Sequence, residues 1–199
     1  MSAQPAAEQA AEDQSPAERW YDLLQQDNRK GDRAALRRAQ QTDDAYGVAS
    51  FHLLLVWLGK QKPPDVAARI AMALAPIRQD RMEQQADGND DDDPAEAPAA
   101  DQPKSWAGTK LGRCMAAKGP SGTPRISPAR VRLLLSTENP DQFLRLLRSI
   151  LGQLDGRAPV REVADVMDGW HSPTWRAAIR RRIFLSYFSN VDVKESKNA

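Results

Sequence analysis

The stretch "RISPARVRLLLSTENPDQFLRLLRSIL" (125–151) decides the fold class, because it contains two consecutive signals for the start of a helix. Ser127 and Asn139 have short side chains that accept hydrogen bonds from the free amides at a helix N-terminus. Each is followed by a proline, which has no amide to leave unpaired at the first helical position. Phe143 and Leu147 then recur one helical turn apart, as on a buried face. The stretch therefore predicts two successive helices.

The same signal recurs in other parts of the chain. Ser15 precedes Pro16 and is followed three residues later by Glu18, which completes a capping box, and Ser172 precedes Pro173. Further helices are expected from Asp32 after Gly31, from Asp44 to Leu58, after Asp65 as N-cap, and over 159–169. No useful run alternates apolar and polar residues as a half-buried strand does. These patterns predict an all-α fold.

Charge is divided unevenly along the chain, although its net value is +1. Residues 1–79 carry ten basic and ten acidic side chains, residues 80–103 carry one and nine, and residues 104–199 carry seventeen and eight. The acidic stretch also contains proline and glycine and lacks apolar periodicity, as linkers do. We therefore expect two small helical subdomains joined by an acidic flexible linker. The expected parts are a tail (1–14), an N-terminal subdomain (15–82), the linker (83–104), a basic C-terminal subdomain (105–190) and a polar tail (191–199).

Sites for catalysis or metal binding find little support in the sequence. One cysteine and two histidines occur, without the spacings of zinc sites. "GPSGTPR" (119–125) has the glycines of a phosphate-binding loop but lacks its GK[ST] ending and a preceding strand. We expect neither enzymatic activity nor a cofactor. The apolar run 51–58 is about half as long as a membrane span, and the N-terminus does not resemble a secretory signal, so a cytoplasmic location without membrane contact is expected.

Basic side chains give the better functional lead. The stretch 110–135 holds six of them and no carboxylate, and the C-terminal part as a whole is positively charged. Arg145 and Arg148 are predicted to lie on the helix face opposite Phe143, and Arg176 and Arg180 are one turn apart on the last helix. Arginines spread over several helices suit contacts to a phosphate backbone better than base-specific readout. A merely solvated surface is the alternative explanation.

Three tryptophans are candidates for stacking on nucleic-acid bases, namely Trp106, Trp170 and Trp175. A buried position in the core is the more common environment of this side chain.

The order of several motifs resembles a known family. "GDRAALRRA" (31–39), "AYGVASFHLLL" (45–55), "KLGRCMAA" (110–117) and the stretch 125–151 follow one another as in the CasB family. CasB is the small subunit of Cascade, the type I-E CRISPR surveillance complex. The resemblance covers residues 19–78 and 105–199, and it rests on the order and spacing of the motifs taken together.

The resemblance implies a specific role in antiviral defence. CasB proteins are all-helical and non-enzymatic, and two copies sit in Cascade against the CasC backbone and the large subunit CasA. Their basic surfaces help to hold the CRISPR RNA–target DNA heteroduplex and the displaced strand. The positions of this chain that match are Arg37, Arg38, Lys110, Arg113, Arg130, Arg132, Arg145, Arg148, Arg176 and Arg180.

Two other functions stay open on the sequence alone. A helical protein–protein adaptor would use the basic face to dock an acidic partner. A helical DNA-binding regulator would instead show sequence preference.

Overall fold

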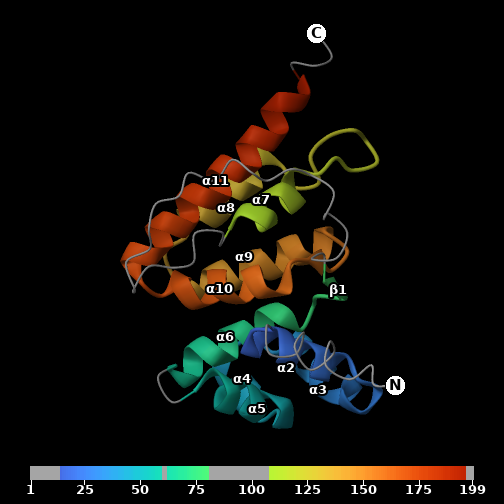
Figure 1. Cartoon of the computed structure of the whole chain (residues 1–199), viewed down its shortest axis with the longest axis vertical. Helices are drawn as coiled ribbons and strands as arrows, with labels where there is room; N and C mark the ends of the chain where they lie inside the picture. The colour runs from blue at the N-terminus through green and yellow to red at the C-terminus, as the bar shows by residue number, and fades with distance from the viewer. Residues whose placement is uncertain (1–13, 60–61, 81–107, 196–199) are drawn as a thin grey trace, which may run out of the picture. The chain divides into compact units, whose positions relative to one another are not determined.

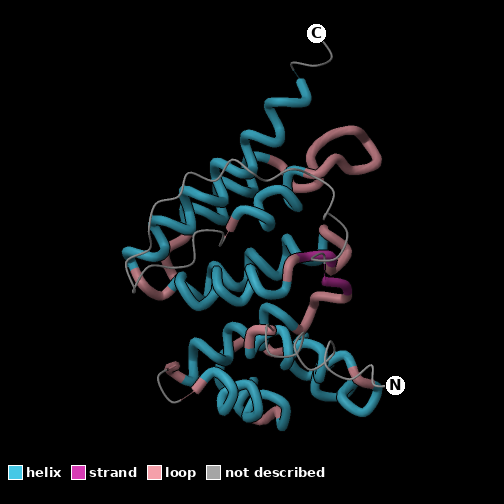
Figure 2. The backbone as a smooth tube through the Cα atoms, viewed as in Figure 1, coloured by secondary structure: helices cyan, strands magenta, loops and turns pink. Residues whose placement is uncertain are grey.

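The computed structural model describes residues 14–59, 62–80 and 108–195, in which the regular secondary structure is helical except for two strands of two residues each (Figures 1 and 2). The predicted all-α fold is confirmed. The chain divides into two compact units, residues 1–75 and 76–199, which are described separately below. The expected acidic linker (83–104) and all but the last residue of the expected N-terminal tail lie outside the described residues.

The first unit is built from short helices around α6. They are α2 (Pro16–Gln25), the 3₁₀ helix η1 (Asp27–Arg29), α3 (Lys30–Arg38), α4 (Thr42–Tyr46), α5 (Ala49–Leu58) and α6 (Pro64–Leu74). α6 packs against α3, α4 and α5, and most of its residues are buried. The predicted capping box of α2 is confirmed: Ser15 Oγ accepts the amide of Glu18 at 3.3 Å, and Glu18 Oε2 accepts the amide of Ser15 at 2.7 Å.

Three predicted boundaries in the first unit are wrong. The helix expected from Asp32 begins at Lys30, because η1 leads directly into it. The helix expected from Asp44 to Leu58 is two helices separated by residues 47 and 48, and the Asp44 carboxylate accepts the amides of two residues before α4. Asp65 does not cap α6, which has Pro63 at the N-cap. Asp65 pairs instead with Arg69 at 2.7 Å, one turn further along the helix.

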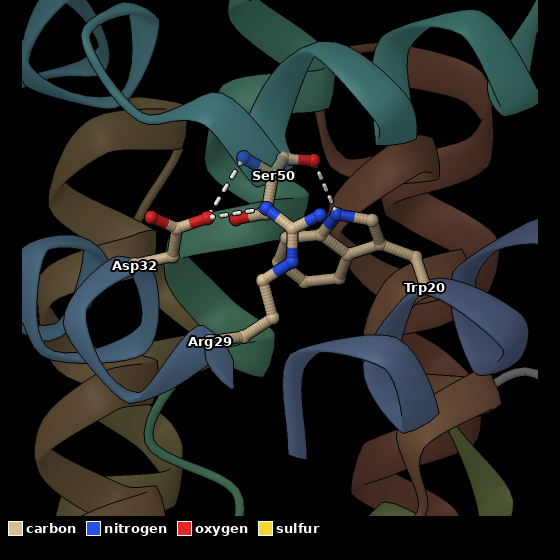
Figure 3. Close-up of polar contacts among 4 residues, drawn as sticks. All are labelled: Trp20, Arg29, Asp32 and Ser50. Atoms are coloured by element: carbon tan, nitrogen blue, oxygen red, sulfur yellow. Dashed lines mark hydrogen bonds and ion pairs between the residues drawn. The ribbon is translucent and has the colours of Figure 1, made fainter. Parts of the chain in front are cut away.

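A partly buried polar cluster connects α2 and α3 to α5 (Figure 3). The indole nitrogen of Trp20 donates to the Ser50 carbonyl at 2.7 Å, and Asp32 Oδ2 accepts the Ser50 amide at 3.0 Å. Arg29 lies 3.4 Å from the same carboxylate oxygen. The first four amides of a helix have no partner within their own helix, and Ser50 is the second residue of α5, so Asp32 satisfies an amide that would otherwise remain unpaired.

The second unit contains the longer helices. Its elements are β1 (Gln79–Asp80), α7 (Thr109–Ala116), α8 (Pro128–Ser136), α9 (Pro140–Gln153), β2 (Arg157–Ala158), α10 (Val160–Trp170) and α11 (Pro173–Glu195). The predicted caps are confirmed, since Ser127 accepts the amide of Arg130, and Asn139 accepts two amides at the start of α9. β1 pairs with β2 in parallel. α11 extends past residue 190, the expected end of the subdomain.

Close contacts between helices fix the core of the second unit. The rings of Phe143 and Trp170 stack at a centroid distance of 3.6 Å, and the Trp170 indole donates to the Thr137 carbonyl at 3.2 Å. α7 lies against α11 so closely that a Cβ on Gly112 would come within 2.8 Å of Ser186 Cβ. α7 thus packs closely against α11, and Trp170 of α10 bonds to the C-cap residue of α8.

Candidate nucleic-acid interface

α8 presents two cations from a helix without carboxylates. Arg130 and Arg132 are both exposed, and no Asp or Glu occurs between residues 128 and 136. Arg130 Nη1 donates to Gln153 Oε1 near the end of α9. The Arg132 guanidinium lies 5.4 Å from the centre of the Phe188 ring on α11, within the range of a cation–π contact. Neutral partners position both groups and leave their charges uncompensated.

The two predicted cations of α9 have different environments. Arg145 is exposed, and among the described residues it has no hydrogen-bond or ion-pair partner. Arg148 is half-buried, and this burial lowers the pKa of its guanidinium. Arg145 is therefore the freer of the two for contact with an external anion.

Lys110 and Arg113 lie three residues apart on the exposed side of α7, while Leu111 and Gly112 are buried. The N-terminus of α7 is held by a carboxylate from α10. Glu162 is 1% exposed and accepts the amides of Lys110 at 3.0 Å and Leu111 at 2.8 Å. Burial raises the pKa of Glu162 to about 7, although these hydrogen bonds act in the opposite direction.

Sequence reasoning did not identify Glu162 as a positioning residue. The available signal is that Glu162 lies in the first turn of "VREVADVM" (160–167), one helical turn before Val166, where an apolar residue is expected.

The predicted pair on α11 is turned toward its own unit. Arg176 Nη1 donates to the Glu138 carbonyl at 2.7 Å, in the connection between α8 and α9. Arg180 is one turn further along, and its Nε and Nη2 atoms are buried without a hydrogen-bond partner. These two arginines are less accessible to a ligand than the cations of α7 and α8 and than Arg145 of α9.

Arg37 and Arg38 belong to the first unit. Arg37 Nε donates to the Ala75 carbonyl at 2.9 Å beyond the end of α6, so this side chain has a structural contact. Arg38 is exposed, and its Nε donates to the carbonyl of Ala34 at 3.2 Å, one turn earlier on the same helix. Arg38 is the more accessible of the two.

The structure thus gives the second unit a set of exposed cations on three helices, which we call the basic set: Lys110, Arg113, Arg130, Arg132 and Arg145. Among the tryptophans considered for stacking, Trp170 is fully buried, Trp175 is half-buried, and Trp106 lies outside the described residues. In the described part of the chain, no group of three or more His, Cys, Asp or Glu side chains is arranged to hold a metal ion. None of the described helices is long and apolar enough to cross a membrane.

Comparison with known proteins agrees with the order of motifs in the sequence. The family model described as CRISPR-associated protein Cse2 matches residues 32–188, and this range contains all ten predicted contact residues. Searches of curated proteins and of solved structures find no match. Because the matched range is more than half of the chain, the family is assigned on it. The chain belongs to the CRISPR-associated Cse2 family, also called CasB, and is a subunit of a CRISPR Cascade complex.

Proposed function

We propose that this subunit is a non-catalytic scaffold that holds nucleic acid in a type I-E Cascade. Its basic set would contact the phosphate backbones of the CRISPR RNA–target DNA heteroduplex and of the displaced strand. The observation that carries the proposal is the exposure of these five cations on α7, α8 and α9. α8 contains no acidic residue, and the carboxyl that interacts with Lys110 of α7 is the buried Glu162 of α10.

The energetics of target binding explain why such a surface is useful. The heteroduplex formed is about as stable as the DNA duplex that it replaces, so strand exchange is nearly balanced. Contacts to the backbone then tip the equilibrium without selecting a sequence. A basic set spread over three helices, without an arrangement for reading base edges, fits that task.

Protein contacts belong to the same proposal. The CasC backbone, the CasA subunit and a second copy of this chain are the partners implied by the family. α5 offers a surface for one of them, since Val56 is 73% exposed and Trp57 38% exposed. Exposed apolar side chains on a short helix are more typical of subunit interfaces than of nucleic-acid contacts.

The test reverses charge in the basic set. In assembled Cascade, Arg130→Glu with Arg145→Glu is expected to weaken target-DNA binding in a mobility-shift assay by about tenfold or more, because two phosphate contacts become repulsive. Lys30→Glu is the matched control, because Lys30 is exposed in the first unit and pairs with Asp27 at 2.9 Å. It should leave binding unchanged.

Unchanged DNA affinity of a normally assembled, normally melting double variant would contradict the proposal. A pull-down from nuclease-treated material tests the adaptor alternative. A purely protein–protein adaptor keeps all its partners after the nucleic acid is removed and does not respond to the charge reversal. A helical regulator would instead enrich a sequence motif in a selection from random DNA.

A further inference from the structure

α11 has an apolar stripe on its exposed side, in addition to the one that it buries. Phe184, Leu185 and Phe188 follow Arg181 at spacings of three, four and seven residues, which place all four on one helix face. Phe184 is 43% exposed and Leu185 53% exposed. The buried stripe of the same helix faces α7 and α10, so packing within the unit does not account for the exposed one.

The two phenylalanines on this face form an anchored pair. Their ring centroids lie 4.4 Å apart with an interplanar angle of 39°. Phe188 also meets the Tyr187 ring edge-on at 4.9 Å, and the Tyr187 hydroxyl donates to the buried Ile126 carbonyl at 2.5 Å. The contact with Tyr187 therefore fixes the position of the Phe188 ring, and the partly exposed ring of Phe184 lies beside it.

Positive charge surrounds the aromatic pair. The Arg132 guanidinium of α8 lies 5.4 Å from the Phe188 ring centre, and Arg181 is exposed one turn before Phe184. The sequence from 173 to 191, like α8, contains no carboxylate. A partner of this face thus needs negative charge together with flat apolar groups. Unpaired nucleotides combine the two, since each has a phosphate and a base with two π faces.

We propose that Phe184 and Phe188, together with Arg132, form a stacking platform for unpaired bases of a single-stranded nucleic acid. The inference rests on the proposed function and adds that this face of α11 binds nucleic acid in its single-stranded form. In a duplex the base faces are already stacked on one another, so the platform gains nothing there. Arg132 holds the adjacent phosphate, and its cation–π contact keeps the guanidinium beside the ring.

The test separates stacking from charge and from apolar docking. Wild-type full chain is titrated by fluorescence anisotropy with three labelled probes of about 15 nucleotides or base pairs: oligo-dT, an abasic strand of the same length, and a duplex. Wild type is expected to bind oligo-dT at least about fivefold more tightly than the abasic strand. Phe184→Leu removes the ring but keeps the side chain apolar, and it should abolish this difference without changing binding of the abasic strand or the duplex.

Two variants keep the result interpretable. Leu185→Ala shortens the neighbouring exposed side chain and should leave all three affinities unchanged, whereas Phe184→Trp, which enlarges the π face, should retain or strengthen oligo-dT binding. Both substitutions at Phe184 are expected to fold, because its ring is partly exposed, and melting curves check this.

The outcomes distinguish this proposal from the one on which it rests. Equal wild-type affinity for oligo-dT and the abasic strand would overturn the platform and leave backbone binding intact. Failure of the chain and of assembled Cascade to bind any probe would contradict both the stacking platform and the proposed function. An unchanged oligo-dT affinity in Phe184→Leu, with weaker binding to another Cascade subunit or to anionic vesicles, would make the face a protein or membrane contact and overturn the platform.

Discussion

The two units of the molecule use positively charged side chains in different ways. In the first unit, Arg29, Lys30 and Arg69 each pair with a carboxylate within one helical turn, and Arg37 bonds a backbone carbonyl. The second unit also has an ion pair, between Arg125 and Asp155, but Arg130 and Arg132 of its basic set have neutral contacts, and the Arg145 side chain has no partner in the described structure. The comparison teaches that local compensation, more than the number of arginines, distinguishes a structural cation from one available to a ligand.

The largest expected difference between the units is a pH dependence of stability that arises in the second. The pKa of Glu162 is about 7 in the folded protein and 4.5 for an unperturbed glutamate, so the folded state binds the proton more tightly. The Glu162 contribution is most favourable below pH 4.5 and is lost as pH rises through about 7, by roughly 3 kcal/mol in total. Chemical denaturation at a series of pH values measures it.

Glu162→Gln is the reference for that measurement, because a glutamine side chain carries no charge at any pH. Its single amide oxygen can replace only one of the two carboxylate oxygens that accept the α7 amides, so the variant is compared by the shape of its pH profile and not by its absolute stability. The variant should lack this part of the decline in stability with rising pH. Parallel pH profiles of wild type and variant would contradict the assignment of a raised pKa to Glu162.

The next effect tests the close approach of α7 to α11. A Cβ at Gly112 would meet the Ile183 carbonyl oxygen at 2.9 Å, and this backbone atom cannot move aside cheaply. Gly112→Ala should therefore destabilise the second unit by about 2 kcal/mol. Gly31→Ala in α3 is the control from the first unit, because nothing lies within 4 Å of its Cβ position. It should be neutral or stabilising by up to about 1 kcal/mol, since alanine is the better helix former. Equal melting temperatures of the two variants would show that the helices separate easily.

A smaller effect is expected from the polar cluster of the first unit. Asp32→Ala leaves the Ser50 amide without its acceptor and should cost about 1–2 kcal/mol of unfolding free energy. Asp27→Ala removes a nearby carboxylate whose side chain is 92% exposed and whose ion pair with Lys30 lies in solvent. It should change stability by less than about 0.5 kcal/mol. Similar losses of unfolding free energy in both variants would show that the contact of Asp32 with the Ser50 amide contributes no more to stability than an exposed ion pair.

The smallest effect on stability is expected at an exposed cation of the second unit. Arg145→Gln removes an exposed cation that has no partner in the described structure, and should shift the unfolding free energy by less than about 0.5 kcal/mol. DNA affinity should nonetheless fall. A variant that melts well below wild type would place Arg145 among the structural residues.

The sequence predicted the helices best where a cap and a proline coincide. The starts after Ser15, Ser127 and Asn139 were all correct, because each cap is a local interaction within four residues. The break at residues 47 and 48 was missed, since a glycine can also continue a helix; in the structure, α4 and α5 each pack on α6 as separate helices. Helix boundaries of this kind depend on tertiary contacts, which the spacing of residues along the sequence does not reveal.

The candidate site was predictable in its charge but not in its geometry. Arg145 and Arg148 were expected on one solvent face, yet Arg148 is half-buried. Helical periodicity gives the direction of a side chain around the helix axis, but it does not show which other residues lie in that direction. The contact of Arg132 with Phe188 joins residues 56 positions apart and follows only from how α8 packs on α11. Only the structure showed that the last helix has apolar stripes on two sides.

The salt dependence of DNA binding tests the central claim most directly. For assembled Cascade, the logarithm of the association constant for target DNA is measured against the logarithm of salt concentration, for wild type and for Arg130→Gln with Arg145→Gln. Each phosphate contact contributes a slope of about −0.9, so the variant's slope should be shallower by one to two. Parallel lines would mean that these arginines release no counterions, and this would contradict a phosphate-binding role for the basic set.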